Sequence, residues 1–233
     1  MLGMSDFLGA AWAIAAKDLR VEWRAKEIVY SMVFFAALVV LLFAFAFTRE
    51  GLSDLNAVAG ALWIAVALTG TLGLNRAVDR EREGNTVRAL LLAPIDRNAI
   101  YLGKLVGITI FILLAEACAV PILALLFQSP LFDHIFPLAV LLVLGTVGYS
   151  AVGSLFAAML GRTRGRDVLL GILLYPIVIP ILLAGTRGTQ ALLMHPADVS
   201  MAWFWAKMIL AFDVVFVTVA LWVYEPLIGV AVE

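Results

Sequence analysis

The stretch IVYSMVFFAALVVLLFAFAF, residues 28–47, contains no charged side chain. An α-helix of about 20 apolar residues spans the hydrocarbon layer of a bilayer with every backbone group hydrogen-bonded internally. The stretch lacks the small-residue cleavage site of a signal peptide, so we expect it to be retained as a transmembrane helix. It is the first indication that the chain is an integral membrane protein.

Five further apolar runs follow this one, and the composition agrees with them. Hydrophobic residues fill 64% of the 233 positions and charged residues 14%, whereas soluble domains carry roughly 25% charged residues. Each run is long enough to span a bilayer, although the fifth only just reaches that length. The sequence therefore predicts an all-α integral membrane protein with six transmembrane helices in one domain, residues 28–233. The further runs cover residues 57–74, 105–127, 135–160, 168–184 and 203–224.

The distribution of the 16 Lys and Arg residues predicts the orientation of these helices. Thirteen of the 16 lie in three segments, which are the N-terminus, the second connection and the fourth connection. Positive charge accumulates on the cytoplasmic side of membrane proteins. We therefore expect these three segments to be cytoplasmic, and six spans return the C-terminus to the same side.

The first 27 residues predict a different kind of helix. Five apolar residues fall on one helical face, and four charged residues lie away from that face. Tryptophan rings favour the headgroup region, and basic side chains favour an anionic leaflet. We therefore expect an amphipathic interfacial helix along the membrane surface, with a cytosolic extension of the first span as the alternative. The apolar residues are Leu8, Trp12, Ala16, Leu19 and Trp23, and the charged ones are Lys17, Asp18, Arg20 and Arg24.

Glycine and proline residues predict the shape of some of the spans. Gly103 and Gly107 have the spacing that allows one helix backbone to approach another closely. Pro176 and Pro180 each remove a backbone donor from the fifth run, so we expect a kink or a break in an already short helix. The mixed polar and apolar segment 185–200 is expected to dip back into the outer leaflet.

The sequence holds no recognisable catalytic or metal-binding motif. It has no G-x-x-x-x-G-K-[ST] phosphate loop, so we expect no ATPase site in this chain. It has no C-x-x-C-H haem-attachment motif and only one cysteine, Cys118. Its two histidines, His134 and His195, are interpreted as polar residues on the outer side and not as metal ligands. The chain is therefore not expected to be an enzyme or to bind a cofactor or metal directly.

Within the second connection, which runs from residue 75 to residue 104, residues 75–98 are more structured than an ordinary loop. Its acidic and basic residues stand at i, i+3 and i, i+4 spacing, which predicts that the second span continues as a helix beyond the membrane. A short helix follows, and its apolar stripe of Val87, Leu90 and Leu91 suits a groove on a partner or the lipid surface. Asp96 is placed to cap the third span. A salt-bridged, solvated turn is the alternative interpretation.

The same segment resembles a known docking element. It reads ERE-x-x-T-x-x-x-LL-x-AP-x-x-R from residue 81 to residue 97, which is similar to the coupling segment of exporter-type permeases of ATP-binding-cassette transporters. Asn85 stands where many of these permeases carry glycine. The resemblance implies contact with a separate ATPase subunit, made by the residues that match the pattern. These are Glu81, Glu83, Thr86, Val87, Leu90, Leu91, Pro94 and Arg97.

Nearly the whole chain resembles one family of that superfamily, the cytochrome c maturation haem exporter protein B (CcmB) family. The resemblance rests on KDLRVEWR at residues 17–24, on the coupling segment, and on LLYPIVIPILLAG at residues 173–185. It implies a permease subunit of an ATP-binding-cassette complex for c-type cytochrome biogenesis at the bacterial inner membrane, with haem as a candidate cargo. The implied partners are a CcmA-like ATPase subunit, CcmC-like and CcmD-like membrane subunits, and a second copy of the chain in a homodimer.

Two acidic residues lie near the middle of predicted spans, Glu116 in the third and Asp213 in the sixth. An ionised carboxylate there costs about 2.5–3.5 kcal/mol, so each acid should face the bundle interior, find a donor or stay protonated. Together with Tyr175, Pro176 and Pro180, these acids are candidates for a translocation path. The alternative for each acid is a protonated side chain that is hydrogen-bonded to a neighbouring Thr or Tyr.

Two other functions are compatible with the sequence. An ion-coupled secondary transporter would use Glu116 and Asp213 as a proton relay, but it would leave the apolar stripe of the second connection unexplained. A different exporter permease, for a drug or a glycolipid, would share the coupling segment, and only the resemblance in the fifth span argues against it.

Overall fold

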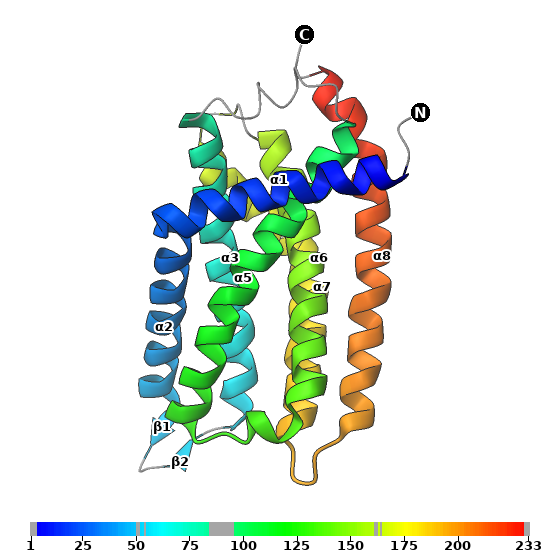
Figure 1. Ribbon diagram of the computed structural model, residues 1–233. Helices are drawn as coiled ribbons and strands as arrows, with labels where there is room; N and C mark the ends of the chain where they lie inside the picture. The colour runs from blue at the N-terminus through cyan, green and yellow to red at the C-terminus, as the bar shows by residue number, and fades with distance from the viewer. Residues whose placement is uncertain are drawn as a thin grey trace.

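The structure, a computed structural model, consists almost entirely of helices (Figure 1). It describes residues 4–49, 52–53, 55–83, 96–160, 163 and 165–230. Six helical segments are long and apolar enough to cross a membrane, as the sequence predicts. The long helices are α1 (Met4–Ala25), α2 (Glu27–Phe47), α3 (Leu55–Glu83), α5 (Arg97–Phe127), α6 (Ile135–Leu160), α7 (Arg166–Leu193) and α8 (Val199–Val230).

Short elements lie at the end of the bundle opposite the two chain termini (Figure 1). Strands β1 (Thr48–Arg49) and β2 (Leu52–Ser53) pair antiparallel, and the 3-10 helix η1 (Leu131–His134) leads into α6.

Asp198 lies just before α8, and its side chain accepts hydrogen bonds from the Ser200 hydroxyl at 2.6 Å and the Met201 N–H at 2.9 Å. These hydrogen bonds lower the pKa of the Asp198 carboxyl.

Helix α3 lies at the centre of the bundle. It packs against α2, α5, α6 and α7, and 67% of its spanning segment is buried, compared with 22% for α8. Its buried surface includes Ala59, Ala61 and Ala65, whose small side chains let the neighbouring helices approach closely. Large apolar side chains stay exposed on the outside of the bundle, for example Phe45 on α2 and Trp222 on α8, where lipid is the solvent.

The indole of Trp63 joins three helices in this core. Its side chain is only 1% exposed, and its Nε1–H donates to the Thr189 hydroxyl on α7 at 3.0 Å. Gly145 on α6 and Gly185 on α7 flank the ring, because a Cβ on either glycine would lie 2.3 Å and 2.2 Å, respectively, from indole carbons. Glycine at both positions therefore makes the space that the tryptophan fills.

Helix α7 contradicts two expectations from the sequence. It runs unbroken through Pro176 and Pro180, so of the expected kink or break the structure excludes the break, and its 28 residues make it amply long for a span. Residues 185–193 continue the helix and do not dip back into the membrane as a separate segment. Two threonines there have partners within the bundle: Thr189 accepts from Trp63, and the Thr186 hydroxyl donates to the Leu182 carbonyl at 2.7 Å. Prolines are tolerated in membrane helices because neighbouring groups satisfy the freed backbone.

Helix α1 lies across the end of the bundle that carries the termini (Figure 1). Its buried face, which includes Ala11, Ile14 and Ala15, packs on α5. A Cβ on Gly103 of α5 would lie 2.7 Å from the Ala11 carbonyl oxygen, so the predicted close approach at this glycine is confirmed. Large members of the predicted apolar face, such as Trp12 and Trp23, are exposed beside the face that contacts the bundle.

The packing of the Trp63 indole between Gly145 and Gly185 provides a test of the fold. Gly145→Ala should destabilise the protein by about 1–3 kcal/mol, because overpacking displaces the hydrogen-bonded indole. Gly60→Ala on α3 is the matched control, since a Cβ there meets nothing within 4 Å. Thermal unfolding in lipid nanodiscs should show a lower midpoint for Gly145→Ala only. Equal midpoints for the two variants would contradict the described packing.

Candidate functional site

The candidate site is the end of the bundle where α3 ends and α5 begins, which we call the coupling end. Helix α3 continues to Glu83, which confirms that the second span extends as a helix. Asp96 caps α5 as predicted, and its side chain accepts from the Asn98 N–H at 2.8 Å. Glu81 lies in the last turn of α3, and Arg97 is the first residue of α5. The other proposed coupling residues lie outside the described residues: Thr86, Val87, Leu90, Leu91 and Pro94.

A buried ion pair connects α3 to α1 at the coupling end. Arg80 Nη1 donates to Glu22 Oε2 at 2.5 Å, and Glu22 is only 3% exposed. The second oxygen of Glu22 accepts from the Val29 N–H at 2.9 Å, in the first turns of α2. Glu22 therefore fixes the corner between α1 and α2, where Lys26 has a positive φ of 58°. Buried carboxylates are stable only with such partners.

A second ion pair connects α3 to α7. The guanidinium of Arg166, which is only 6% exposed, donates to Asp79 through Nη2 and to Asp167 through Nε. Asp79 lies one residue before Arg80, so consecutive positions of α3 are bound to different helices. The helix end that leads into the coupling segment is thus held from two directions.

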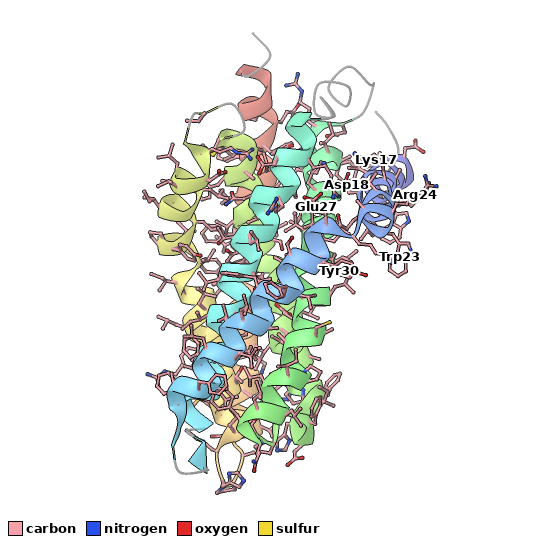
Figure 2. All side chains as sticks on the ribbon, turned by 90° about the vertical axis from the view of Figure 1, so that its left-hand side faces the viewer. Lys17, Asp18, Trp23, Arg24, Glu27 and Tyr30 are labelled. Carbon is pink, nitrogen blue, oxygen red and sulfur yellow. The ribbon has the colours of Figure 1, made fainter. Side chains whose placement is uncertain are left out.

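The start of α5 has equivalent contacts. Lys104 Nζ donates to Asp18 Oδ2 of α1 at 3.0 Å, and Arg97 Nη1 donates to the Glu225 carbonyl oxygen of α8 at 3.3 Å. Figure 2 shows Asp18 on the side of α1 next to the bundle and Arg24 on the opposite side. The sequence placed Asp18 away from the apolar face that holds Trp12 and Trp23, but it did not predict the pairing with Lys104. Helix α1 therefore bonds to both helices that flank the coupling segment.

A hydroxyl cluster lies deeper in the bundle, and it brings one predicted residue together with two that the sequence did not single out. The hydroxyl of Thr71 on α3 is hydrogen-bonded to the Tyr149 hydroxyl on α6 at 2.7 Å and to the Tyr175 hydroxyl on α7 at 3.0 Å. Tyr149 also contacts the Ala67 carbonyl oxygen at 2.7 Å. The available sequence signal for this cluster was the presence of hydroxyl-bearing residues within apolar runs. The sequence does not show which of these hydroxyls lie within hydrogen-bonding distance of one another.

The two intramembrane acids are both buried but have different surroundings. Glu116 accepts a hydrogen bond from the Thr146 hydroxyl at 2.6 Å, as the threonine alternative expects. Asp213 has no hydrogen-bond partner among the described residues. It lies against Gly148 of α6, where a Cβ would approach its Oδ1 to 2.0 Å. Neither acid is hydrogen-bonded to Tyr175, so the structure does not join the proposed path residues into one polar network.

Within the part of the chain that the structure describes, no three His, Cys, Asp or Glu residues come together as a metal site. The coupling end therefore consists of charged contacts between helix ends, and these contacts lie next to a tightly packed core.

Comparison with known proteins identifies the family to which the chain belongs. A protein-family model described as "CcmB protein" matches residues 9–226. Heme exporter protein B of Rhodobacter capsulatus is 30% identical over 184 residues, which cover 77% of this chain and 84% of the relative. Heme exporter protein B of Pseudomonas aeruginosa is 28% identical over 193 residues, 82% of this chain and 85% of the relative. The Escherichia coli K12 protein of the same name is 28% identical over 80% of this chain and 85% of its own length. The chain therefore belongs to the CcmB protein family.

Proposed function

We propose that the chain is the membrane permease subunit of a haem-export complex that serves c-type cytochrome biogenesis. The observation that carries this proposal is the match to the family over residues 9–226, together with relatives that are named heme exporter protein B. The six spanning helices agree with a permease. Haem is the proposed cargo of the complex.

ATP hydrolysis is assigned to a separate, CcmA-like subunit that docks on the coupling segment. The contacts at the coupling end support this assignment, because they bind both flanking helices to the rest of the bundle. Arg80 and Arg166 hold the end of α3, and Lys104 and Arg97 hold the start of α5. A movement of α3 or α5 would therefore be passed to α1, α7 and α8 directly through these contacts. The remaining proposed partners are CcmC-like and CcmD-like membrane subunits and a second copy of this chain.

The coupling end is proposed to face the cytoplasm of a bacterial cell, with both termini on that side of the inner membrane. Thirteen of the 16 basic residues support this orientation, because in the sequence they lie in the N-terminal segment and in the second and fourth connections between spans. The exposed tryptophans of α1, Trp12 and Trp23, support its place at the membrane surface.

The orientation can be tested by labelling single cysteines in a Cys118→Ala background. Asp133→Cys and His195→Cys are at exposed or partly exposed positions at the end away from the termini, and Thr163→Cys is exposed between α6 and α7. A membrane-impermeant thiol reagent should label only the first two in spheroplasts. Thr163→Cys should react after the membrane is permeabilised. Labelling of Thr163→Cys in sealed spheroplasts would show the opposite orientation.

The docking assignment can be tested at the apolar stripe. Burial of a leucine side chain contributes about 1.5–3 kcal/mol, so Leu90→Asp should weaken ATPase binding by at least about tenfold. Arg88→Ala, on the opposite face of the predicted short helix, is the control and should change little. Co-purification of the ATPase from membranes is the measurement. The coupling assignment fails if Leu90→Asp retains the ATPase as well as the unchanged chain does.

A second candidate function, an ion-coupled transporter, rests on the burial of Glu116 and Asp213. Glu116→Gln and Asp213→Asn keep shape and some hydrogen bonding but remove the titratable proton. An ATP-driven permease should therefore keep most of its activity, whereas a proton relay should lose nearly all of it. The measurement is c-type cytochrome yield at matched protein abundance. Complete loss in either variant, with the ATPase still bound, would favour the proton relay.

A further inference from the structure

Helix α1 separates its charged side chains by sign. Its acids face the bundle, where Glu22 pairs with Arg80 of α3 at 2.5 Å and Asp18 pairs with Lys104 of α5 at 3.0 Å. Three basic side chains in the second half of α1, or just after its end, are exposed and have no acidic partner among the described residues. The outward side of α1 therefore carries unpaired positive charge. These three residues are Arg20, Arg24 and Lys26.

Large aromatic side chains lie beside this charge. Trp12 is 62% exposed and Trp23 is 78% exposed. The two are eleven residues apart, close to three helical turns, so they project from the same side of α1. Figure 2 shows Arg24 pointing away from the bundle and Trp23 pointing along its side. Helix α1 thus presents an apolar edge next to a basic edge, which is the arrangement of helices that lie in the membrane interface.

The neighbouring helices place this face at the depth of lipid headgroups. Helix α1 ends at Ala25, and the spanning helix α2 begins at Glu27 and exposes Tyr30 in its first turn. Helix α1 also rests near the start of the spanning helix α5, where the Ala11 carbonyl approaches Gly103. It therefore lies level with the starts of two spans. Tryptophan and tyrosine side chains favour this depth of a bilayer.

We propose that the outward face of α1 binds anionic phospholipids, with Arg20, Arg24 and Lys26 at the phosphates and Trp12 and Trp23 at the boundary of the acyl chains. The proposal rests on the membrane-surface position of α1 in the proposed function, and it adds a preference for one class of lipid. Each basic side chain near an anionic surface strengthens binding about fivefold. Because the inner side of α1 is bonded to α3 and α5, the bound lipids attach the coupling end to the leaflet.

Tryptophan quenching by brominated phospholipids tests the proposal on the full chain in lipid nanodiscs. The signal of α1 is the part of the quenching that is lost in Trp12→Phe/Trp23→Phe. In mixtures of the two lipids, brominated phosphatidylglycerol should quench this signal with an apparent affinity several-fold higher than that of brominated phosphatidylcholine.

Removal of the basic charges should remove this preference. Arg24→Gln should lower it, and Arg20→Gln/Arg24→Gln should bring it close to one. Arg24→Lys keeps the charge and should keep most of the preference. Arg187→Gln is the matched control, because it removes the charge of an exposed arginine at the other end of the bundle, and it should change nothing. High salt should weaken the preference of the unchanged chain, since it screens exposed charges.

The proposal fails if both lipids quench the α1 signal equally in the unchanged chain, a result that leaves the proposed function intact. It also fails if Arg24→Gln and Arg187→Gln change the preference to the same extent. Quenching that is present in the isolated chain but absent from the complex purified with its partner subunits would show that a protein covers this face, and would overturn the proposal. Absence of quenching by either lipid would overturn it together with the membrane-surface position of α1. Both leaflets of a nanodisc contain the same mixture, so no outcome depends on the orientation or the cargo.

Discussion

The rest of the structure depends on the way Trp63 is seated between two glycines. Because Gly145 and Gly185 have no side chain, α6 and α7 both come close to the indole, and its N–H is bonded to Thr189. This contact fixes α3 against two neighbours at once. A central helix that is fixed in this way can transmit movement along its axis, since packed interiors are stiff. The role proposed for the coupling end follows from that rigidity.

Rigid packing in the core is combined with charged contacts at the coupling end. Hydrocarbon offers no hydrophobic force between helices, so the spans rely on close packing and internal hydrogen bonds. The ends of α3 and α5 lie beyond the apolar spans and use ion pairs such as Arg80 with Glu22 and Lys104 with Asp18. Ion pairs reach across larger gaps than packed side chains do. Close packing therefore holds the interior of the bundle, and ion pairs hold its coupling end.

The sequence predicted the membrane fold well because its signal is local. Runs of apolar residues identify spans one at a time, and the run 135–160 coincides with α6. The errors concern side chains whose partners are distant in sequence. Thr189 lies in a segment that resembles a loop, and only the fold brings it to Trp63, 126 residues away. The pairing of Asp18 with Lys104, 86 residues away, was not predicted for the same reason. The interior clusters depend on helix rotation, which apolar runs do not encode.

The same distant pairings impose an order on biosynthesis. Helix α1 is synthesised before its partners: Glu22 must wait for Arg80, 58 residues later, and Asp18 for Lys104, 86 residues later. At about 5–20 residues per second, the second wait is roughly 4–17 s of translation. Until both ion pairs have formed, the exposed tryptophans of α1 can anchor the helix at the membrane surface. The final position of α1 is thus decided only after the start of α5 has been synthesised.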